Sequence, residues 1–386
     1  MIPVNEPLLD GKERVYLNEC IESGWISSDG AFVERFERAM AGYVGRRHAI
    51  AVANGSAALD VAAVALRLGP DDEVIIPTHT IISCASAIVR TGARLRLVDS
   101  SPDTWNMDVT KIESAITGRT RAIMAVHTFG LPVDMAPLLD IARKYGLVVI
   151  EDAAQAIGQA YNEAKCGSFG DISCFSFYAN KHITTGEGGM IVCDDDELAT
   201  RARSLRNLCF KPERRFVHEE LGWNYRMSNL QAAVGLAQFE KLDAHVARKR
   251  ELGRRYESLL RGVPGIGMAP VALPYAENIY WVFGMVLDDS LPFDADELRS
   301  MLAEAGVSAR PFFWPMHEQP VFLKQGMFKG ENFPIAERMS RRGLYLPSGL
   351  ALTEAQQDYT VGVVRDTLAT AFSRSFRNSR SSSARC

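Results

Sequence analysis

The sequence lacks the short motifs that bind a dinucleotide, a nucleoside triphosphate or a zinc ion. No G-x-G-x-x-G follows the first expected strand, no G-x-x-x-x-G-K-[ST] occurs, and both C-x-x-C and H-E-x-x-H are missing. These absences argue against a nicotinamide enzyme, an ATPase and a zinc protein, and we expect no bound metal. The 7 cysteines form no close pairs, and several lie in apolar runs, where reduced buried thiols are typical.

The chain also has little net charge and no long apolar run. Its formal net charge is −4, from 43 Lys and Arg against 47 Asp and Glu, which gives no sign of a nucleic-acid partner. The longest apolar runs are too short to span a bilayer. The first seven residues lack the basic and then apolar layout of a secretory signal. We therefore expect a soluble, cytoplasmic protein that binds neither nucleic acid nor membrane.

Apolar segments of strand length alternate with helical segments over the first part of the chain. Strands are expected at residues 48–53, 73–77, 94–99, 122–127 and 147–152. Helices are expected at residues 32–44, 57–68, 83–91, 111–116 and 135–145. This alternation indicates an α/β fold with a largely parallel sheet covered on both faces. Function in such a sheet gathers at the carboxyl ends of the strands, where the sequence places Asn54, His79, Asp99, His127, Asp152 and Ser176.

The remaining chain predicts a second, smaller unit. A charged helix at 195–207 is followed by an irregular connection at 210–227 and by a helix from 229 to about 245, which continues as a second helix to 260. Strands are then expected at 280–287 and 307–311, and helices at 294–305, 334–343 and 353–369. We expect a large domain over residues 1–245, a small α+β domain over 246–372, and a disordered Ser- and Arg-rich tail over 373–386.

Lys181 is the first candidate for chemistry. It follows an apolar run and precedes the glycine-rich bend at 186–189, and its neighbours are small, aromatic or hydroxylated. His182 is its only basic neighbour. Such a site suits an amine that loses its proton and attacks a carbonyl. From this position alone, a solvated loop lysine is the alternative.

Two further features suggest a partner for that amine. Asp152 ends the very apolar run 147–150, and a buried carboxylate needs a cationic partner. The protonated pyridine nitrogen of pyridoxal phosphate would be one, and the pairing turns the ring into an electron sink. The turn at Gly55 and Ser56, between a strand and a helix, offers free backbone N–H groups to an anion. A helix cap or surface ion pair for Asp152, and a plain helix cap for Ser56, are the alternatives.

With these residues in place, the chain resembles the DegT/DnrJ/EryC1/StrS family of pyridoxal-phosphate-dependent sugar aminotransferases. The matching motifs are ANGSAAL at 53–59, VIEDAAQAIG at 149–158, GSFGD at 167–171, KHITTGEGG at 181–189 and NYRMSNLQAA at 224–233. The resemblance extends from Ile2 to about Ala369. It implies fold type I, the aspartate-aminotransferase-like fold, with a three-layer large domain and a small C-terminal domain.

The resemblance also implies roles for individual residues around pyridoxal 5'-phosphate. Lys181 would link covalently to the aldehyde of the cofactor and then act as general base and acid. Asp152 would pair with the pyridine nitrogen, and Gln155 would lie near the phenolic oxygen. The phosphate would be held at the turn and strand end formed by Gly55, Ser56, the amide of Ala57, and Ser176.

Other positions concern the partner subunit and the sugar. Asn224 would reach the phosphate of a neighbouring subunit, which implies a homodimer with shared active sites and explains the long connection at 210–227. Trp25, Ser27 and His317 are candidates for the sugar pocket. For the segment that contains Trp25 and Ser27, a turn followed by an edge segment is the alternative.

One position departs from the family pattern. Relatives place an aromatic residue, stacked on the cofactor ring, where this chain has Ile81. The aliphatic side chain of Ile81 can still cover the ring, or His79 can stack instead. We expect altered cofactor contacts rather than lost activity.

The implied reaction is the transfer of an amino group, with glutamate as the expected donor, to the 4-keto carbon of a nucleotide-linked 6-deoxyhexose. Residues 2–14 and 310–317 carry a narrower resemblance to members that aminate GDP-4-keto-6-deoxymannose. A UDP-, dTDP- or CDP-linked sugar is the alternative. A dehydratase is disfavoured because such relatives replace the lysine by histidine, whereas Lys181 is present and His182 lies one position away. A sugar sensor on the same fold would not need Lys181 and Asp152.

Overall fold

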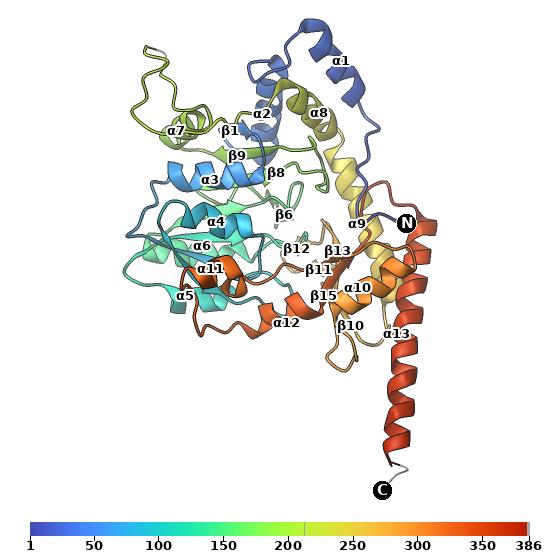
Figure 1. The fold of residues 1–386 in the computed structure, drawn as a ribbon. Coiled ribbons are helices and arrows are strands. Elements are labelled where there is room, and N and C mark those ends of the chain that lie inside the picture. Colours follow the sequence, from blue (N-terminus) through green and yellow to red (C-terminus); the bar gives the residue numbers. More distant parts are fainter. Residues whose placement is uncertain (212, 384–386) are drawn as a thin grey trace.

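The centre of the protein is a seven-stranded sheet. The computed structural model describes residues 1–211 and 213–383 (Figure 1). In spatial order the strands are β1 (His48–Val52), β9 (Gly189–Cys193), β8 (Ile172–Ser176), β5 (Val148–Asp152), β4 (Thr120–Val126), β2 (Glu73–Pro77) and β3 (Arg94–Val98). β9 pairs antiparallel with both of its neighbours, and the other pairs are parallel. The prediction of a largely parallel sheet is confirmed.

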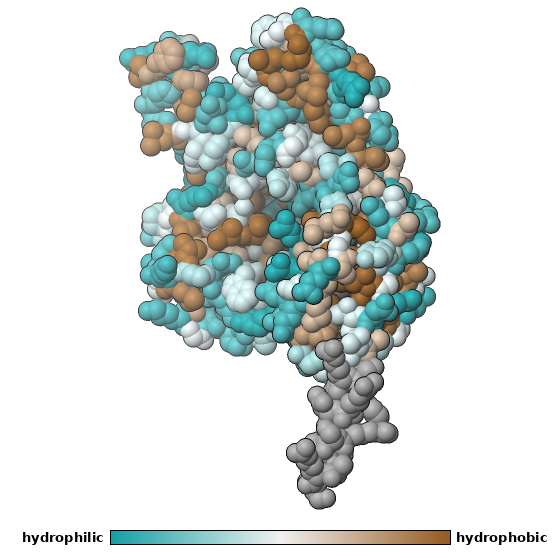
Figure 2. Space-filling view, turned by 45° about the vertical axis from the view of Figure 1, so that its right-hand side comes forward, coloured by the Kyte–Doolittle hydropathy of each residue, from teal (hydrophilic) through white to brown (hydrophobic). Residues whose placement is uncertain are grey.

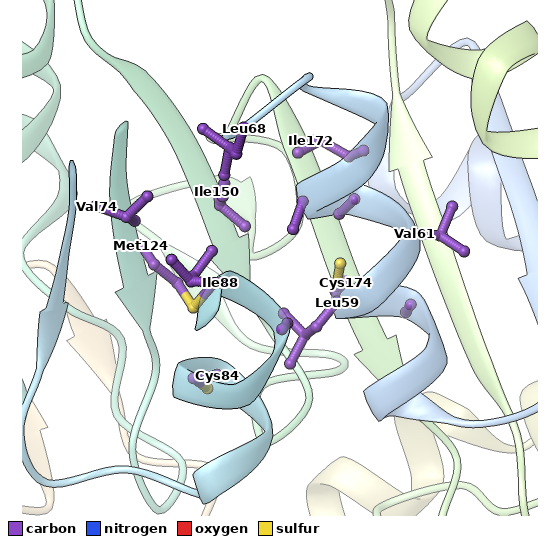
Figure 3. Packing of buried hydrophobic residues seen from close by; sticks show 14 of the residues in the cluster. Leu59, Val61, Leu68, Val74, Cys84, Ile88, Met124, Ile150, Ile172 and Cys174 are labelled. Carbon is purple, nitrogen blue, oxygen red and sulfur yellow. The ribbon is translucent and has the colours of Figure 1, made fainter. Parts of the chain in front are cut away.

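Helices cover both faces of this sheet. One face packs against α3 (Gly55–Ala65), α4 (Ile82–Val89) and α7 (Asp196–Arg206), and Figure 3 shows part of that apolar layer. The other face packs against α2 (Ala31–Val44), α5 (Ile112–Ala115), α6 (Met135–Tyr145) and α8 (Asn229–Phe239). Ile76 points into the first layer and Ile75 into the second. Because both faces are buried, the strands read as continuous apolar runs, and three layers result.

A second, antiparallel sheet forms the core of the C-terminal part. Its strands in spatial order are β10 (Ile266–Met268), β13 (Phe283–Leu287), β15 (Gly343–Leu346) and β14 (Arg310–Pro311). Its core is shared with α9 (Leu242–Leu260), α10 (Ala295–Glu304) and α13 (Glu354–Ser383), and α12 (Pro334–Arg342) contacts β13 and β15. The short elements are α1 (Glu13–Ser23), η1 (Val109–Lys111), β6 (Ala160–Tyr161), β7 (Ala164–Lys165), β11 (Ala272–Leu273), β12 (Ala276–Glu277), η2 (Met316–Glu318) and α11 (Pro320–Lys324).

The helix expected from 229 to about 245 ends earlier than the pattern indicates. α8 ends at Phe239 and α9 begins at Leu242. At the break, the carboxylate of Glu240 accepts a hydrogen bond from the Tyr16 hydroxyl at 2.6 Å and pairs with Lys12 at 2.9 Å. Contacts with the N-terminal segment therefore override the local helical pattern. β15 was also missed, because a four-residue apolar run after a helix cannot be told from its last turn.

α9 crosses the division predicted at residue 245. Its Val246 packs in the core of the large domain and its Tyr256 in the core of the small one. The first residues of the chain lie on the small domain, since Ile2 N–H donates to the carbonyl of Gly306 at 2.7 Å. The division at residue 245 stays a prediction. Ile2, which the prediction places in the large domain, is bonded to the small one.

The last helix is longer than expected. α13 reaches Ser383 and extends away from the body of the protein (Figure 1), into the segment 373–386 that the sequence predicts to be disordered. Residues 384–386 lie outside the described part of the chain. Among the described residues, no helix combines the length and the apolar character that crossing a membrane requires.

The two domains meet through aromatic rings and one buried lysine. Phe129 and Phe312 lie with their ring centroids 4.4 Å apart. Lys249 of α9 is buried, and its ammonium donates to the carbonyl of Trp281 at 2.9 Å and to that of Ser348. Burial lowers the pKa of Lys249 to about 7. The loop before β13, which carries Trp281, is therefore held in place from the helix that joins the domains.

Two helix glycines test this junction. A Cβ on Gly253 of α9 would overlap the ring of Tyr280, whereas a Cβ on Gly362 of α13 would meet no atom within 4 Å. We expect Gly253→Ala to lower the free energy of unfolding by about 2 kcal/mol through overpacking. We expect Gly362→Ala to raise it by about 0.5 kcal/mol, because alanine restricts the unfolded chain. Urea denaturation measures both; equal effects of one sign would contradict the packing.

Candidate active site

A cavity of about 570 Å³ opens at the carboxyl ends of the parallel strands, next to the domain junction. Asp152 is the last residue of β5 and Ser176 the last of β8, and α3 begins just after β1. The cavity brings together six of the predicted site residues: Gly55, Ser56, Asp152, Gln155, Ser176 and Lys181. The cavity therefore lies at the edge of the sheet where the alternation of strands and helices predicts the functional residues.

Lys181 lies half-buried in this cavity. Its Nζ is 3.8 Å from the centroid of the Trp281 ring, and the indole N–H of Trp281 donates to the carbonyl of Asn180 at 2.9 Å. Burial lowers the pKa of Lys181 to about 7, although the charge of Asp152 acts in the opposite direction. The amine can therefore lose its proton near neutral pH, which a nucleophile and proton carrier requires.

Asp152 is a buried carboxylate that lines the same cavity. Its Oδ1 accepts a hydrogen bond from the N–H of Ala154 at 3.0 Å, and its Oδ2 accepts one from the thiol of Cys84 at 3.0 Å. Among the described residues, no ion pair forms with it within 4.0 Å. A buried carboxylate held by two donors and left without a cation fits a protonated ring nitrogen of a bound cofactor.

The turn before α3 forms a site for an anion. A Cβ on Gly55 would lie 2.7 Å from Cβ of Ser176, so only glycine allows this close approach. The hydroxyls of Ser56 and Ser83 lie 2.7 Å apart, and both residues line the cavity at the start of a helix. Hydroxyls and a helix N-terminus together suit a phosphate group. Ser83 was missed by the sequence analysis, although it lies in the first turn of an expected helix.

The start of α3 differs in one detail from the expectation. The helix begins at Gly55, and its N-cap is Asn54 rather than Ser56. The Asn54 side chain accepts the N–H of Ala57 at 2.8 Å. The predicted role of the Ala57 amide at the phosphate stays a prediction, and this N–H would have to exchange its present partner.

Gln155 and Ile81 both face the cavity, whereas His79 does not. Gln155 is buried, and its Oε1 accepts the N–H of Phe129 at 2.9 Å. Ile81 is 38% exposed. His79 is fully buried against three phenylalanine rings, and burial lowers its pKa to about 3. Of the two side chains considered for covering the cofactor ring, the structure favours Ile81.

Besides Ala57, four predicted residues lie outside the lining of this cavity. His317 is buried, with its ring nitrogens 2.9 Å from Oγ1 of Thr78 and 3.1 Å from the carboxylate of Glu337. Both nitrogens are bonded within the protein, and the predicted place of His317 in a sugar pocket stays a prediction. Trp25 and Ser27 are exposed on the connection between α1 and α2, and Asn224 is exposed on the connection before α8.

The aromatic lining of the cavity was also missed. Trp281, Phe313 and Tyr345 come from the domain junction, and Tyr178 precedes the lysine loop. The sequence placed Trp281 inside an expected strand, although β13 begins only at Phe283. Its position beside Lys181 depends on the packing of the two domains, which no local pattern shows.

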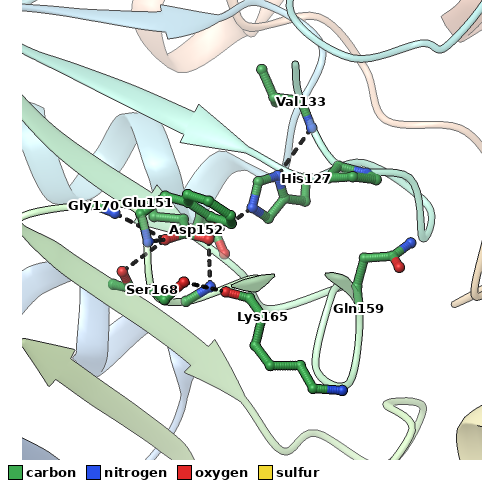
Figure 4. A network of polar contacts seen from close by, with 12 residues as sticks. His127, Val133, Glu151, Asp152, Gln159, Lys165, Ser168 and Gly170 are labelled. Carbon is green, nitrogen blue, oxygen red and sulfur yellow. Dashed lines mark hydrogen bonds and ion pairs between the residues drawn. The ribbon is translucent and has the colours of Figure 1, made fainter. Parts of the chain in front are cut away.

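Directly behind Asp152, Glu151 is the centre of a buried polar network (Figure 4). Its carboxylate accepts hydrogen bonds from a histidine ring, a serine hydroxyl and three backbone N–H groups, namely those of His127, Ser173, Gly167, Phe169 and Gly170. Nδ1 of His127 accepts the N–H of Val133, so its proton is on Nε2. The thiol of Cys166 lies close enough to His127 and Glu151 for the three side chains to hold a metal ion. However, the carboxylate of Glu151 already accepts five hydrogen bonds, so we assign this network to holding the end of β5 in place.

Comparison with known proteins decides the family. The model of the DegT/DnrJ/EryC1/StrS aminotransferase family matches residues 7–365. This chain belongs to that family. It is 43% identical to a GDP-perosamine synthase of Caulobacter vibrioides, over 95% of this chain and 98% of the relative. A GDP-perosamine synthase of Escherichia coli O157:H7 is 40% identical, over 93% and 96%.

Solved structures agree with the family. The S. venezuelae protein DesV, in complex with a ketimine intermediate, superposes with a TM-score of 0.85 at 35% identity, covering 92% of this chain and 94% of DesV. The chain is therefore a pyridoxal-phosphate-dependent aminotransferase of fold type I. The predicted family, fold class, cofactor and enzyme class are confirmed.

The residues of the cavity fit pyridoxal phosphate. Asp152 would hold the proton of its ring nitrogen, and the turn at Gly55 with Ser56 and Ser176 would hold its phosphate. When bound, the cofactor supplies an electron sink for the carbon next to the amino nitrogen. Lys181 would supply the amine that takes and returns the proton, and its low pKa would make both directions accessible near neutral pH. The ring of Trp281 lies against that amine and limits its solvation.

The low pKa of Lys181 can be measured in the cofactor-free protein. With trace acetic anhydride, we expect the labelling rate of Lys181 to reach half its maximum near pH 7, where the amine loses its proton. Lys144 is a control, because hydrogen bonding to Glu113 raises its pKa. Mass spectrometry of the labelled peptides gives both rates. A rate at Lys181 that follows that of Lys144 across the pH range would contradict the burial argument.

Proposed function

We propose that this enzyme transfers the amino group of glutamate to the 4-keto carbon of GDP-4-keto-6-deoxymannose and releases GDP-perosamine. The observation that carries the reaction class is the meeting of Lys181 and Asp152 in one cavity. Support for the substrate comes from three relatives named GDP-perosamine synthase, which are 43%, 40% and 39% identical over at least 92% of this chain. The intact lysine argues against the dehydratase alternative.

A different nucleotide is the second candidate. A relative from Streptomyces venezuelae is named dTDP-3-amino-3,4,6-trideoxy-alpha-D-glucose transaminase and is 37% identical over 87% of this chain. The scaffold therefore occurs with a dTDP-linked sugar at a similar level of identity. Within the cavity, the aromatic side chains of Tyr178, Phe313 and Tyr345 offer apolar surface to a deoxyhexose of either kind.

A substrate panel tests this proposal. Purified enzyme with pyridoxal phosphate and glutamate is offered the GDP-, UDP-, CDP- and dTDP-linked 4-keto-6-deoxyhexoses, and mass spectrometry detects the aminated product. We expect turnover of the GDP-linked sugar, and none with Lys181→Ala because the reacting amine is absent. Turnover of another nucleotide sugar alone would reject the GDP assignment and leave the aminotransferase standing. Loss of water without gain of nitrogen would point to the dehydratase.

We also propose a homodimer in which each active site uses residues of both chains. Asn224 is exposed and does not line the cavity of its own chain. Large apolar side chains are exposed on the same connection and on that between α1 and α2: Phe216 is 80%, Leu221 89% and Trp25 58% exposed. Figure 2 shows hydrophobic side chains on the upper lobes of the molecule. Such surface favours a partner chain. We propose that Trp25 and Ser27 contact the sugar in the site of the partner subunit.

A subunit-mixing experiment tests the shared site. We expect Lys181→Ala subunits to be inactive and Asn224→Ala subunits to be weakly active. The two variants are unfolded together and refolded as a mixture. If Asn224 serves the partner, each hybrid dimer has one intact site, and about a quarter of the sites recover activity. If Asn224 serves its own chain, no hybrid site is intact and activity stays at the level of the separate variants. A monomer in sedimentation at working concentration would also reject the proposal.

We propose the cytoplasm as the location of the reaction. The six described cysteines, from Cys20 to Cys209, are all buried and free. Free buried thiols are typical of a reducing compartment.

A further inference from the structure

The thiol of Cys84 lies between the active-site carboxylate and the core. Cys84 is in α4, is fully buried and is one of the residues labelled in Figure 3. Its Sγ is 3.0 Å from Oδ2 of Asp152 and 3.3 Å from Oγ1 of Thr80. An ionised carboxylate only accepts hydrogen bonds, so the single thiol proton lies on the bond to Asp152. The hydroxyl of Thr80 must then donate to the sulfur.

Burial and charge fix the direction of these two consecutive hydrogen bonds. Thr80 donates to Cys84, and Cys84 donates to Asp152. Burial, together with the neighbouring charge of Asp152, raises the pKa of the Cys84 thiol well above its usual value. The thiol therefore keeps its proton near neutral pH. The other oxygen of Asp152 is held by the N–H of Ala154, so the two donors fix the plane of the carboxylate.

We propose that Cys84 is a positioning residue for the cofactor: its S–H bond holds Asp152 in the orientation in which the carboxylate meets the pyridine nitrogen. A thiol is a weak donor, so it orients the carboxylate while leaving most of its negative charge for the ring nitrogen. A hydrogen bond to a buried charged group contributes more than one between neutral groups. The inference rests on the proposed pairing of Asp152 with that nitrogen.

The chain contains a matched control for this role. Cys174 of β8 lies opposite Asp152 in the sheet register, belongs to the same apolar cluster, and is 1% exposed where Cys84 is 0% exposed. Among the described residues, no hydrogen bond joins its thiol to Asp152. Replacing Cys174 therefore changes the same core by the same volume without removing a donor from the carboxylate.

The first experiment needs no cofactor. Infrared difference spectra of the cofactor-free protein, wild type minus Cys84→Val and wild type minus Cys174→Val, isolate the S–H stretch of each thiol. We expect the Cys84 band to lie at lower frequency, because donation to a carboxylate weakens the S–H bond. If both bands lie at the frequency of a free thiol, the inference is wrong, whatever reaction the enzyme performs. Cys84→Ser gives the same difference band and replaces Cys84→Val if the valine variant fails to fold.

The second experiment measures cofactor affinity by absorbance titration. We expect Cys84→Val to bind pyridoxal phosphate about tenfold more weakly than wild type, because the carboxylate loses one of its two donors. We expect the affinity of Cys84→Ser, which keeps a donor to Asp152, to stay within about threefold of wild type. The same is expected for Cys174→Val, because this change removes no donor from Asp152. Equal weakening by Cys84→Val and Cys174→Val would show a packing effect and overturn the positioning role. A failure of all variants and of wild type to bind would reject the cofactor site itself, and the infrared result would stand apart.

Discussion

The carboxylate of Asp152 is a buried charge for which the described residues provide donors but no ion-pair partner. Burying a carboxylate without a cation is unfavourable, and hydrogen bonds at the end of β5 offset part of that free energy. Ala154, which lines the cavity, and Cys84, which lies in the core, bond its two oxygens, while the network around Glu151 holds the end of the strand. The free energy of cofactor binding therefore depends on how well the neighbouring elements keep one carboxylate in place.

The rest of the cavity complements that charge. The turn before α3 offers a helix N-terminus and hydroxyls to an anion, and the carboxylate in the same cavity requires a cation. Lys181 lies between aromatic surface and Asp152, in surroundings that disfavour its charged form. A ligand with a phosphate at one end and a protonated ring nitrogen at the other matches this polarity, which is why the geometry and the family comparisons agree.

The features that the sequence predicted share one property: they depend on neighbours in the chain. Strands such as β2 are apolar on both faces, so their length and burial are visible in the sequence, and Asp152 is visible as the polar end of such a run. The break before Leu242 depends on contacts of Glu240 with residues near the N-terminus, more than 200 positions away. The position of Trp281 beside Lys181, and the thiol bond of Cys84, depend in the same way on packing between distant segments. The sequence does not show whether His317 faces the cavity or the core, because a histidine in an aromatic loop looks the same in both cases.

Because α9 is one continuous helix that packs in both domains, it links the two domains mechanically. Its first turns are packed into one domain and its last turns into the other, and Lys249 holds the Trp281 loop from its middle. A helix of this kind acts as a strut between the domains, because its two ends are packed into different cores. The two domains that line the cavity are therefore joined by one continuous helix. Sugars of different size must be accommodated by the loops at the rim, and selection for a new nucleotide sugar should change those loops while leaving the strut as it is.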